Sequence, residues 1–401
     1  MPKQSESALA QLRRSHEERV LTLLRKHGAL SRREIGDLSG LSRTTLHDII
    51  SGLAARGAVV SMTQDSISRG RGRPAESVAL NPAAGQAIGI DFARRHVHVA
   101  VVNMAHEVIG SADRVHPATL PWTKRVELAE QMIAELAEGA IRLGALTGIG
   151  VGVVGPVAGS GQEGAVRRLD VVSQLLRKRF GVPVLVDNNT RLAALGESVW
   201  GAAIGCQDVV YLRLSHGVGG GLVLGGSLHR GAYGISGEFG HTTVDPEGAA
   251  CRCGGRGCLE TVASVKALAA AHRAAGGRPG GFAGLLAAVE DGEDRALDLL
   301  TRAGALTGQV LAGVCNAVGP GLVVIGGELA EFGPAFLRPV EAALRKHVIP
   351  TARGRLRVRP AALGDAGAAL GAIALVLHES PLLARYPSVP DTEETEERDN
   401  S

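Results

Sequence analysis

Three stretches within the first 55 residues repeat their apolar positions with the period of an α-helix. The first covers residues 16–26, and the second begins at Ser31, which can form a capping box with Glu34. We expect this short second helix to bury Ile35 and Leu38 and to end at Ser39-Gly40. The third begins at Ser42 and repeats its apolar residues at i, i+3, i+4 and i+7, namely Leu46, Ile49, Ile50 and Leu53. Two short helices joined by a glycine-containing turn predict a helix-turn-helix unit.

Two β-prone segments, residues 59–63 and 77–80, follow the third helix and flank an arginine-rich sequence. This pattern predicts a wing with a basic tip. Arg, Thr and His side chains at the start of a recognition helix can reach base edges, and wing arginines suit the minor groove. The alternative is a solvated three-helix module used for dimerisation. The predicted DNA contacts, in a domain of residues 1–82, are Ser42, Arg43, Thr44, Thr45, His47, Arg69, Arg71 and Arg73.

From residue 83 the pattern changes to short buried strands that alternate with amphipathic helices. Helical periodicity predicts helices over residues 123–143 and 169–180. Apolar runs predict strands at residues 87–92, 97–103, 149–154, 184–186, 209–214, 222–224 and 322–325. Strand pairs followed by helices occur in both halves, which predicts an α/β fold.

The composition fits two or three folding units whose cores consist of small aliphatic side chains. Aromatic residues make up only 3% of the 401 residues, whereas glycine occurs 55 times. The chain opens with no apolar signal region, and its longest mostly apolar run, residues 366–377, is too short to cross a bilayer. An odd number of cysteines fits a reducing compartment. We therefore expect a cytoplasmic protein without a membrane partner.

The net charge of +3 is unevenly distributed along the chain. Residues 1–80 contain 13 Lys and Arg against 8 Asp and Glu, so the basic excess lies where DNA binding is predicted. Residues 381–401 end in an acidic segment that lacks apolar side chains. This composition predicts a disordered acidic tail.

One histidine and three cysteines that are close in sequence predict a metal site. Cys251 lies ten residues after His241, and Cys253 and Cys258 follow it with glycines between them. Three thiolates and one imidazole are a tetrahedral donor set that zinc prefers in structural sites. The alternative is a group of buried thiols, but the intervening glycines and arginines make a poor core segment. We predict zinc as the cofactor.

Several short motifs between residues 85 and 378 carry a family resemblance. They are Gly89-Ile-Asp91, Gly150-Val-Gly152, Gly155-Pro156, Asp187-Asn188-Asn189, Gly196-Glu197, Gly217-Val-Gly-Gly-Gly221, Gly237-Glu-Phe-Gly-His241, the cysteine cluster through Glu260, and Gly326-Gly327. With these motifs the chain resembles the ROK family (repressors, open reading frames, kinases), which has the actin-like sugar-kinase fold.

The resemblance implies a duplicated ribonuclease H-like domain with an N-terminal lobe at residues 83–190 and a C-terminal lobe at residues 191–380. A winged helix in front of this scaffold resembles the family's transcriptional repressors, which bind operator DNA as oligomers and respond to a sugar or sugar phosphate. It therefore implies a repressor of carbohydrate metabolism that acts as a homodimer or homotetramer. The implied sugar contacts are Asn188, Asn189, Glu238, His241 and Glu260.

Three segments depart from the pattern of the family's kinases. The first hairpin has Ala93 where the kinases have the glycine of Asp-x-Gly-x-Thr, and the second phosphate loop has Ser215-His216 in place of Gly-Thr. Asn189 replaces the catalytic aspartate, and an amide cannot accept the proton of a sugar hydroxyl as a carboxylate does. We therefore predict no catalytic residues and no enzyme activity.

Two other functions stay open at this point. One is an active sugar kinase that carries a fused DNA-binding domain. The other is a regulator that binds no sugar and is controlled by a protein partner. The short segment 157–166, which stands where family members have a longer loop closing over the sugar, is the only support for the second.

Overall fold

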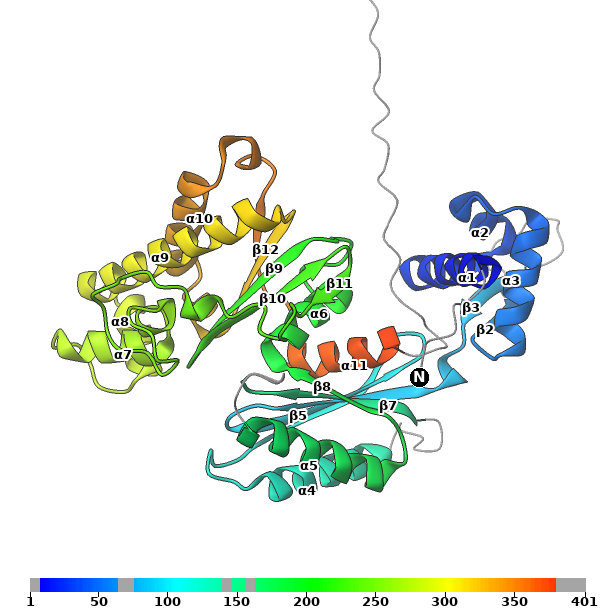
Figure 1. The fold of residues 1–401 in the computed structure, drawn as a ribbon, viewed down its shortest axis with the longest axis horizontal. Helices are drawn as coiled ribbons and strands as arrows, with labels where there is room; N and C mark the ends of the chain where they lie inside the picture. The colour runs from blue at the N-terminus through cyan, green and yellow to red at the C-terminus, as the bar shows by residue number, and fades with distance from the viewer. Residues whose placement is uncertain (1–7, 64–75, 139–145, 156–162, 380–401) are drawn as a thin grey trace, which may run out of the picture.

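The computed structural model describes residues 8–63, 76–138, 146–155 and 163–379, which form three units with one β-sheet each (Figure 1). One sheet has three strands and the other two have five strands each. Among the helices of these ranges, none combines the length and the hydropathy needed to cross a bilayer. The predicted acidic tail and the arginine-rich tip of the wing lie outside the described residues.

The N-terminal unit has the element order of a winged helix. Its elements are α1 (Ala8–His27), β1 (Leu30–Ser31), α2 (Arg32–Ser39), α3 (Arg43–Ala55), β2 (Val59–Thr63) and β3 (Glu76–Leu80). The capping box of Ser31 and Glu34 is present, and Ser42 caps α3. All four apolar residues predicted to face the core from α3 are buried. The prediction for Leu38 was wrong: it is 53% exposed, because α2 turns Ile35 and Ser39 inward.

The first lobe is built on a five-stranded sheet with the order β6-β5-β4-β7-β8. Its strands are β4 (Gln86–Phe92), β5 (His96–Asn103), β6 (Val108–Val115), β7 (Leu146–Val153) and β8 (Val184–Asn188). Helices α4 (Trp122–Ala137) and α5 (Glu163–Phe180) cover one face, where Val126 and Leu176 share a core with Ile90 of β4.

The second lobe repeats the same strand arrangement with the order β11-β10-β9-β12-β13. Its strands are β9 (Val209–Leu214), β10 (Val218–Leu224), β11 (Ser227–His229), β12 (Leu322–Gly326) and β13 (Arg357–Pro360). In both sheets an antiparallel three-stranded meander continues into two parallel strands. Helices α9 (Asp294–Val318) and α10 (Pro334–His347) cover the outer face, and α7 (Val265–Ala274) and α8 (Phe282–Glu290) lie beside them. The repeated topology confirms the predicted duplicated α/β fold.

Helices α6 (Asn189–Trp200) and α11 (Gly367–Glu379) pack against each other between the two sheets (Figure 1). Helix α11 lies against β4 and β7 of the first lobe, whereas α6 lies against β9 and β10 of the second. The sequence-based division at residue 190 assigns each of these helices to the second lobe. By its contacts, α11 also completes the inner face of the first sheet.

The winged unit and the first lobe share one hydrophobic core. Val20 and Leu53 of the winged unit belong to the same buried cluster as Ala100 of β5 and Ile373 of α11. The two units are therefore packed together and are not separate bodies on a free linker.

The strands predicted from apolar runs are all present, whereas three edge strands of the two lobes were missed. These are β6, β11 and β13, whose exposed and partly polar side chains gave no buried run in the sequence. Helix α5 begins at Glu163, six residues before the predicted start, because apolar periodicity is visible only from residue 169 onward.

Candidate functional site

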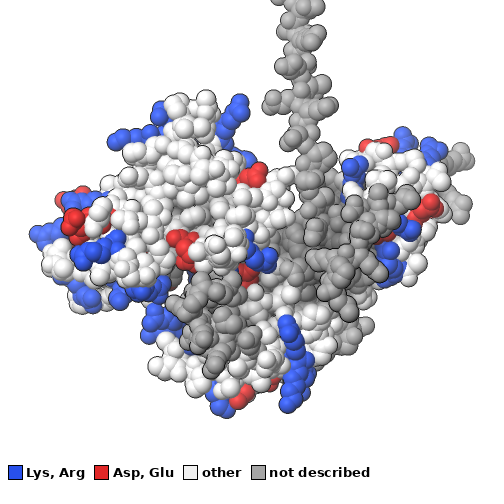
Figure 2. Space-filling view, in the orientation of Figure 1, with Lys and Arg blue, Asp and Glu red and all other residues white. Residues whose placement is uncertain are grey.

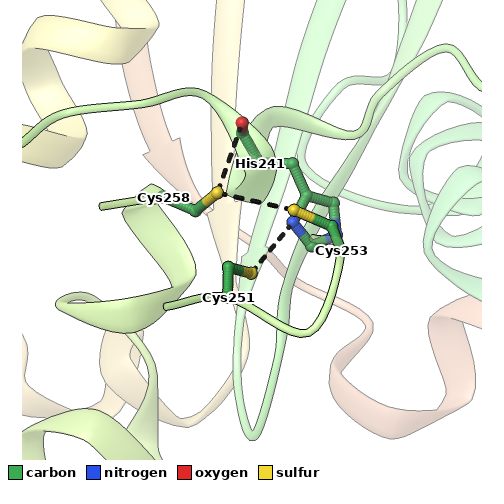
Figure 3. A group of neighbouring side chains, drawn as sticks. All are labelled: His241, Cys251, Cys253 and Cys258. Carbon is green, nitrogen blue, oxygen red and sulfur yellow. Dashed lines mark hydrogen bonds between the residues drawn. The ribbon is translucent and has the colours of Figure 1, made fainter. Parts of the chain in front are cut away.

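His241 and the three cysteines come together in one loop (Figure 3). His241 ends a short 3-10 helix (Phe239–His241), and the backbone of residues 250–256 turns back on itself around the thiols. The amide of Cys251 donates to the carbonyl of Gly255 at 2.8 Å, and the amide of Gly254 donates to the carbonyl of Cys251 at 3.0 Å. Gly254 has φ +93°, a backbone conformation that residues with a side chain rarely adopt. One potential ligand atom from each of the four residues lies within 4.8 Å of the other three.

The distances between these atoms fit a four-coordinate cation. A tetrahedral centre with metal–sulfur bonds of about 2.3 Å and metal–nitrogen bonds of about 2.0–2.1 Å places sulfurs about 3.8 Å apart and sulfur about 3.5 Å from nitrogen. In the structure, the sulfurs of Cys253 and Cys258 are 3.7 Å apart, and the Cys251 sulfur is 3.6 Å from Nδ1 of His241. These two distances match a tetrahedral site, and all four ligand atoms lie close enough together to hold a metal ion.

The carboxylates of Glu238 and Glu260 flank this loop. Oε2 of Glu238 lies 3.8 Å from Nε2 of His241, the ring nitrogen on the side away from the thiols. Glu260 lies two residues after Cys258 and accepts a hydrogen bond from the amide of Val218 at 2.9 Å. Arg252, located between two of the predicted ligands, pairs with both oxygens of Glu260 at 2.9 and 3.1 Å. The loop that contains His241 and the three cysteines thus places two carboxylates and one imidazole near the start of β10.

The glycines of β10 allow α6 and the loop before His241 to approach this strand closely. A Cβ atom at Gly221 would overlap Ala194 of α6, and one at Gly220, on the opposite face, would overlap the ring of Phe239. A Cβ atom at Gly219 would lie 3.5 Å from Oγ1 of Thr190, at the start of α6. Because α6 begins at Asn189, the predicted amide contacts lie near one face of β10, and Phe239, next to Glu238, packs on the other face.

Asn188 and Asn189 are both buried at the junction of β8 and α6. Oδ1 of Asn188 caps the helix by accepting from the amides of Thr190 at 2.9 Å and Arg191 at 3.1 Å. Its amide nitrogen donates to the carbonyl of Gly155 at 2.9 Å. The side chain of Asn188 therefore has a local structural role, whatever else it contacts.

A charged cluster lies between the lobes beside Asn189. The side chains of Asn189 and Asp91 both pack over Gly152 of β7. Burial raises the pKa of Asp91 to about 6, although the guanidinium group of Arg213 opposes this shift. Arg213, on β9 of the other lobe, lies 3.4 Å from Asp365. The cluster thus joins charges from both lobes at the place where the sequence departs from the kinase pattern.

The amino-terminal turn of α3 is the second candidate site. Oγ of Ser42 accepts from the amide of Thr45 at 3.2 Å and lies 2.9 Å from its hydroxyl, so both side chains serve the helix cap. Arg43, Thr44 and His47 are exposed on the winged unit, whose surface shows both basic and acidic side chains (Figure 2). Of the eight predicted DNA contacts, Arg69, Arg71 and Arg73 lie outside the described residues.

Sequence reasoning missed several charged residues that shape the first site. Arg252 was seen only as a poor core residue, although its place between Cys251 and Cys253 brings it close to Glu260. Nothing in the sequence indicates that the charge of Arg213 acts on Asp91, because 122 positions separate the two residues. The buried carboxylate of Asp187, which pairs with Arg191 and Arg230, was read only as part of a family motif.

Comparisons with known proteins agree with this architecture. The profile of the ROK family matches residues 87–379. The xylose repressor of Bacillus spizizenii is 25% identical over 376 residues, which cover 91% of this chain and 96% of the repressor. A glucokinase of Streptomyces coelicolor is 29% identical over 325 residues, which cover 75% of this chain and 100% of the glucokinase.

A solved structure of a ROK family transcriptional regulator, a homologue of the Escherichia coli Mlc protein, superposes with a TM-score of 0.76 at 25% identity. The match covers 93% of this chain and 98% of that protein. The two regulator matches cover 91% and 93% of this chain, whereas residues 87–401 make up less than four fifths of it. Both regulators therefore also match part of the N-terminal unit. The family profile covers most of the chain, and the protein belongs to the ROK family.

Proposed function

We propose that this protein is a transcriptional repressor of carbohydrate metabolism whose binding to operator DNA is controlled by a sugar or sugar phosphate. The observation that carries the proposal is the winged unit, which shares a hydrophobic core with a ROK domain. A xylose repressor and an Mlc homologue match the chain over both parts, whereas the glucokinase match covers a smaller share of it.

The exposed start of α3 supports recognition of the major groove. Arg43, Thr44 and His47 present guanidinium, hydroxyl and imidazole groups that can reach base edges, while Ser42 and Thr45 hold the helix end. One recognition helix covers only a few base pairs, so we expect a homodimer or homotetramer on a palindromic operator. Arginines of the wing would add contacts to the minor groove.

The loop that contains His241 and the three cysteines supports the proposal of a bound zinc ion with a sugar site next to it. Three thiolates, one imidazole and the observed spacing suit zinc in a closed structural site. Held by this ion through Nδ1, His241 would turn Nε2 toward a sugar hydroxyl beside Glu238. Glu260 and the two asparagines would complete the contacts. The cysteines of such a zinc site must stay reduced, and they do so in a reducing compartment such as the cytoplasm.

Three features argue against phosphoryl transfer as the function. Asn189 cannot act as a general base, and Ala93 and His216 stand in the two loops that face the nucleotide phosphates in the family's kinases. Arg213 acts electrostatically on Asp91 and brings a fixed positive charge to the side of the second lobe that faces the first. A sugar kinase would need all of these positions to support catalysis.

Selection of duplex DNA from a random library with the full-length chain tests the proposal. We expect enrichment of a palindrome whose half-sites are about 10 base pairs apart, or a multiple of that spacing. Pentoses, hexoses and hexose 6-phosphates are then added to the purified complex, and at least one should change the DNA affinity. Absence of any enriched sequence, or sugar-dependent release of ADP from ATP, would refute the assignment.

A further inference from the structure

Helix α6 connects the proposed ligand site with the far end of the domain. It begins with Asn189, directly after the capping residue Asn188, and ends at Trp200. Its 12 residues span about 18 Å, and an unbroken run of buried residues covers Arg191 to Glu197. Because it is buried between two sheets, a displacement at its first turn moves its last turn as well.

At its carboxyl-terminal end, α6 contacts the turn between β5 and β6. The indole nitrogen of Trp200 donates to the carbonyl of His106 at 3.0 Å, and the centroids of the two rings are 5.6 Å apart. His106 has φ 65°, which makes it the one residue other than glycine with a positive φ in the described part of the chain. Asn103 holds this turn by accepting from the amides of Ala105 at 2.9 Å and Glu107 at 3.1 Å.

The same turn contacts the segment that leads into the winged unit. The amide of Met104 donates to the carbonyl of Gly85 at 3.2 Å, five residues after the end of β3. The Met104 side chain is buried in the core shared with Val20 and Leu53 of the winged unit, and Trp200 packs against this core. A continuous path of contacts thus runs from the start of α6 to the DNA-binding unit.

We propose that Trp200 and His106 relay the effect of ligand binding at the start of α6 to the winged unit. This inference rests on the proposed function and concerns the regulation of the same site. A small shift of α6 would move the indole and, through its hydrogen bond, the turn held by Asn103. Met104 would pass the movement to Gly85 and to the core of the winged unit, because closely packed elements rearrange together.

Trp200→Phe and His106→Gly interrupt this path in two different ways. The first removes the indole N–H donor and keeps an aromatic ring. The second removes the imidazole ring next to the indole, while glycine suits the positive φ, so the fold should be retained. Trp122→Phe is the matched control, since Trp122 stacks edge-on against Phe92 at 5.7 Å in the core of the first lobe.

The test compares the dissociation constant for the selected DNA with and without a saturating sugar. Calorimetry with pentoses, hexoses and hexose 6-phosphates first identifies a sugar that binds the wild-type chain. In wild type and Trp122→Phe, we expect this sugar to change the DNA dissociation constant about tenfold. In Trp200→Phe and His106→Gly, the change should fall below about twofold, with sugar affinity and sugar-free DNA affinity retained.

The outcomes separate the relay from the proposed function. Wild-type coupling in both relay variants would overturn the relay and leave the regulator intact. Sugar binding that leaves the DNA affinity of the wild type unchanged would also overturn it. If no sugar binds the wild-type chain, control by a sugar fails and the relay fails with it. Equal losses in the Trp122→Phe control would show that the coupling depends on general packing and not on this path.

Discussion

Replacing Asp91 with asparagine should stabilise the protein at neutral pH and leave its stability at pH 4 nearly unchanged. The Asp91 side chain is buried, and burial raises its pKa from 3.8 to about 6 against the opposing effect of Arg213. A pKa that is higher in the folded state means that the folded chain holds its proton more tightly. Asp91 therefore destabilises the fold progressively as the pH rises from about 4 through 6.

The expected size of the effect follows from the difference between the two pKa values. One pKa unit corresponds to about 1.4 kcal/mol, so the ionised carboxylate costs up to about 3 kcal/mol above pH 6. Asp91→Asn removes the charge at similar volume. Urea unfolding should show the variant to be more stable than wild type at pH 8, with the gain disappearing at pH 4.

The control is Asp37→Asn, because the side chain of Asp37 is 74% exposed. Its stability should follow that of the wild type at both pH values within about 0.5 kcal/mol. An Asp91→Asn variant that gains nothing at pH 8, or gains equally at pH 4 and pH 8, would contradict the reasoning. The first result would mean that Arg213 compensates fully for the burial of the charge.

Three further predictions concern the metal, the DNA and the chemistry. Metal analysis should find one zinc per chain, and Cys253→Ser should lower both the zinc content and the thermal midpoint; full stability of a zinc-free protein would exclude a structural role. Arg43→Ala should weaken binding to the selected DNA by about 1–3 kcal/mol and relax specificity at one base pair, as measured by fluorescence anisotropy. Asn189→Asp should not create sugar kinase activity in a coupled ADP-release assay, because Ala93 and His216 remain in the phosphate loops; turnover in this variant alone would show those loops to be competent.

The sequence was most informative where one local interaction determines a structure. The capping box at Ser31 and the cap at Ser42 located two helix starts, because a side chain there satisfies backbone groups three residues away. The clustering of His241 with the three cysteines was predicted in the same way, since only 17 positions separate the first of these residues from the last. Buried strands such as β9 were predicted because both faces of a central strand are buried, so its sequence is a continuous apolar run.

What the sequence concealed depends on contacts between distant segments. The electrostatic effect of Arg213 on Asp91 requires the two lobes to face each other, and no local pattern encodes that. Edge strand β13 carries alternating arginines and therefore leaves no apolar run in the sequence. Its pairing with β12 is visible only in the structure. The contacts of α11 with both lobes were hidden for the same reason, because an apolar helix does not reveal which sheets it covers.

The crossing of α6 and α11 has a consequence for how the two lobes can move. A Cβ atom at Gly371 would overlap the carbonyl oxygen of Leu192, and one at Gly196 would overlap that of Gly367, so the two backbones touch. Each helix also packs on a different sheet. Opening or closing of the lobes must therefore pivot about this crossing, with the helices as lever arms. Adding one methyl group at Gly371 would push the backbones apart and reset the resting angle between the lobes.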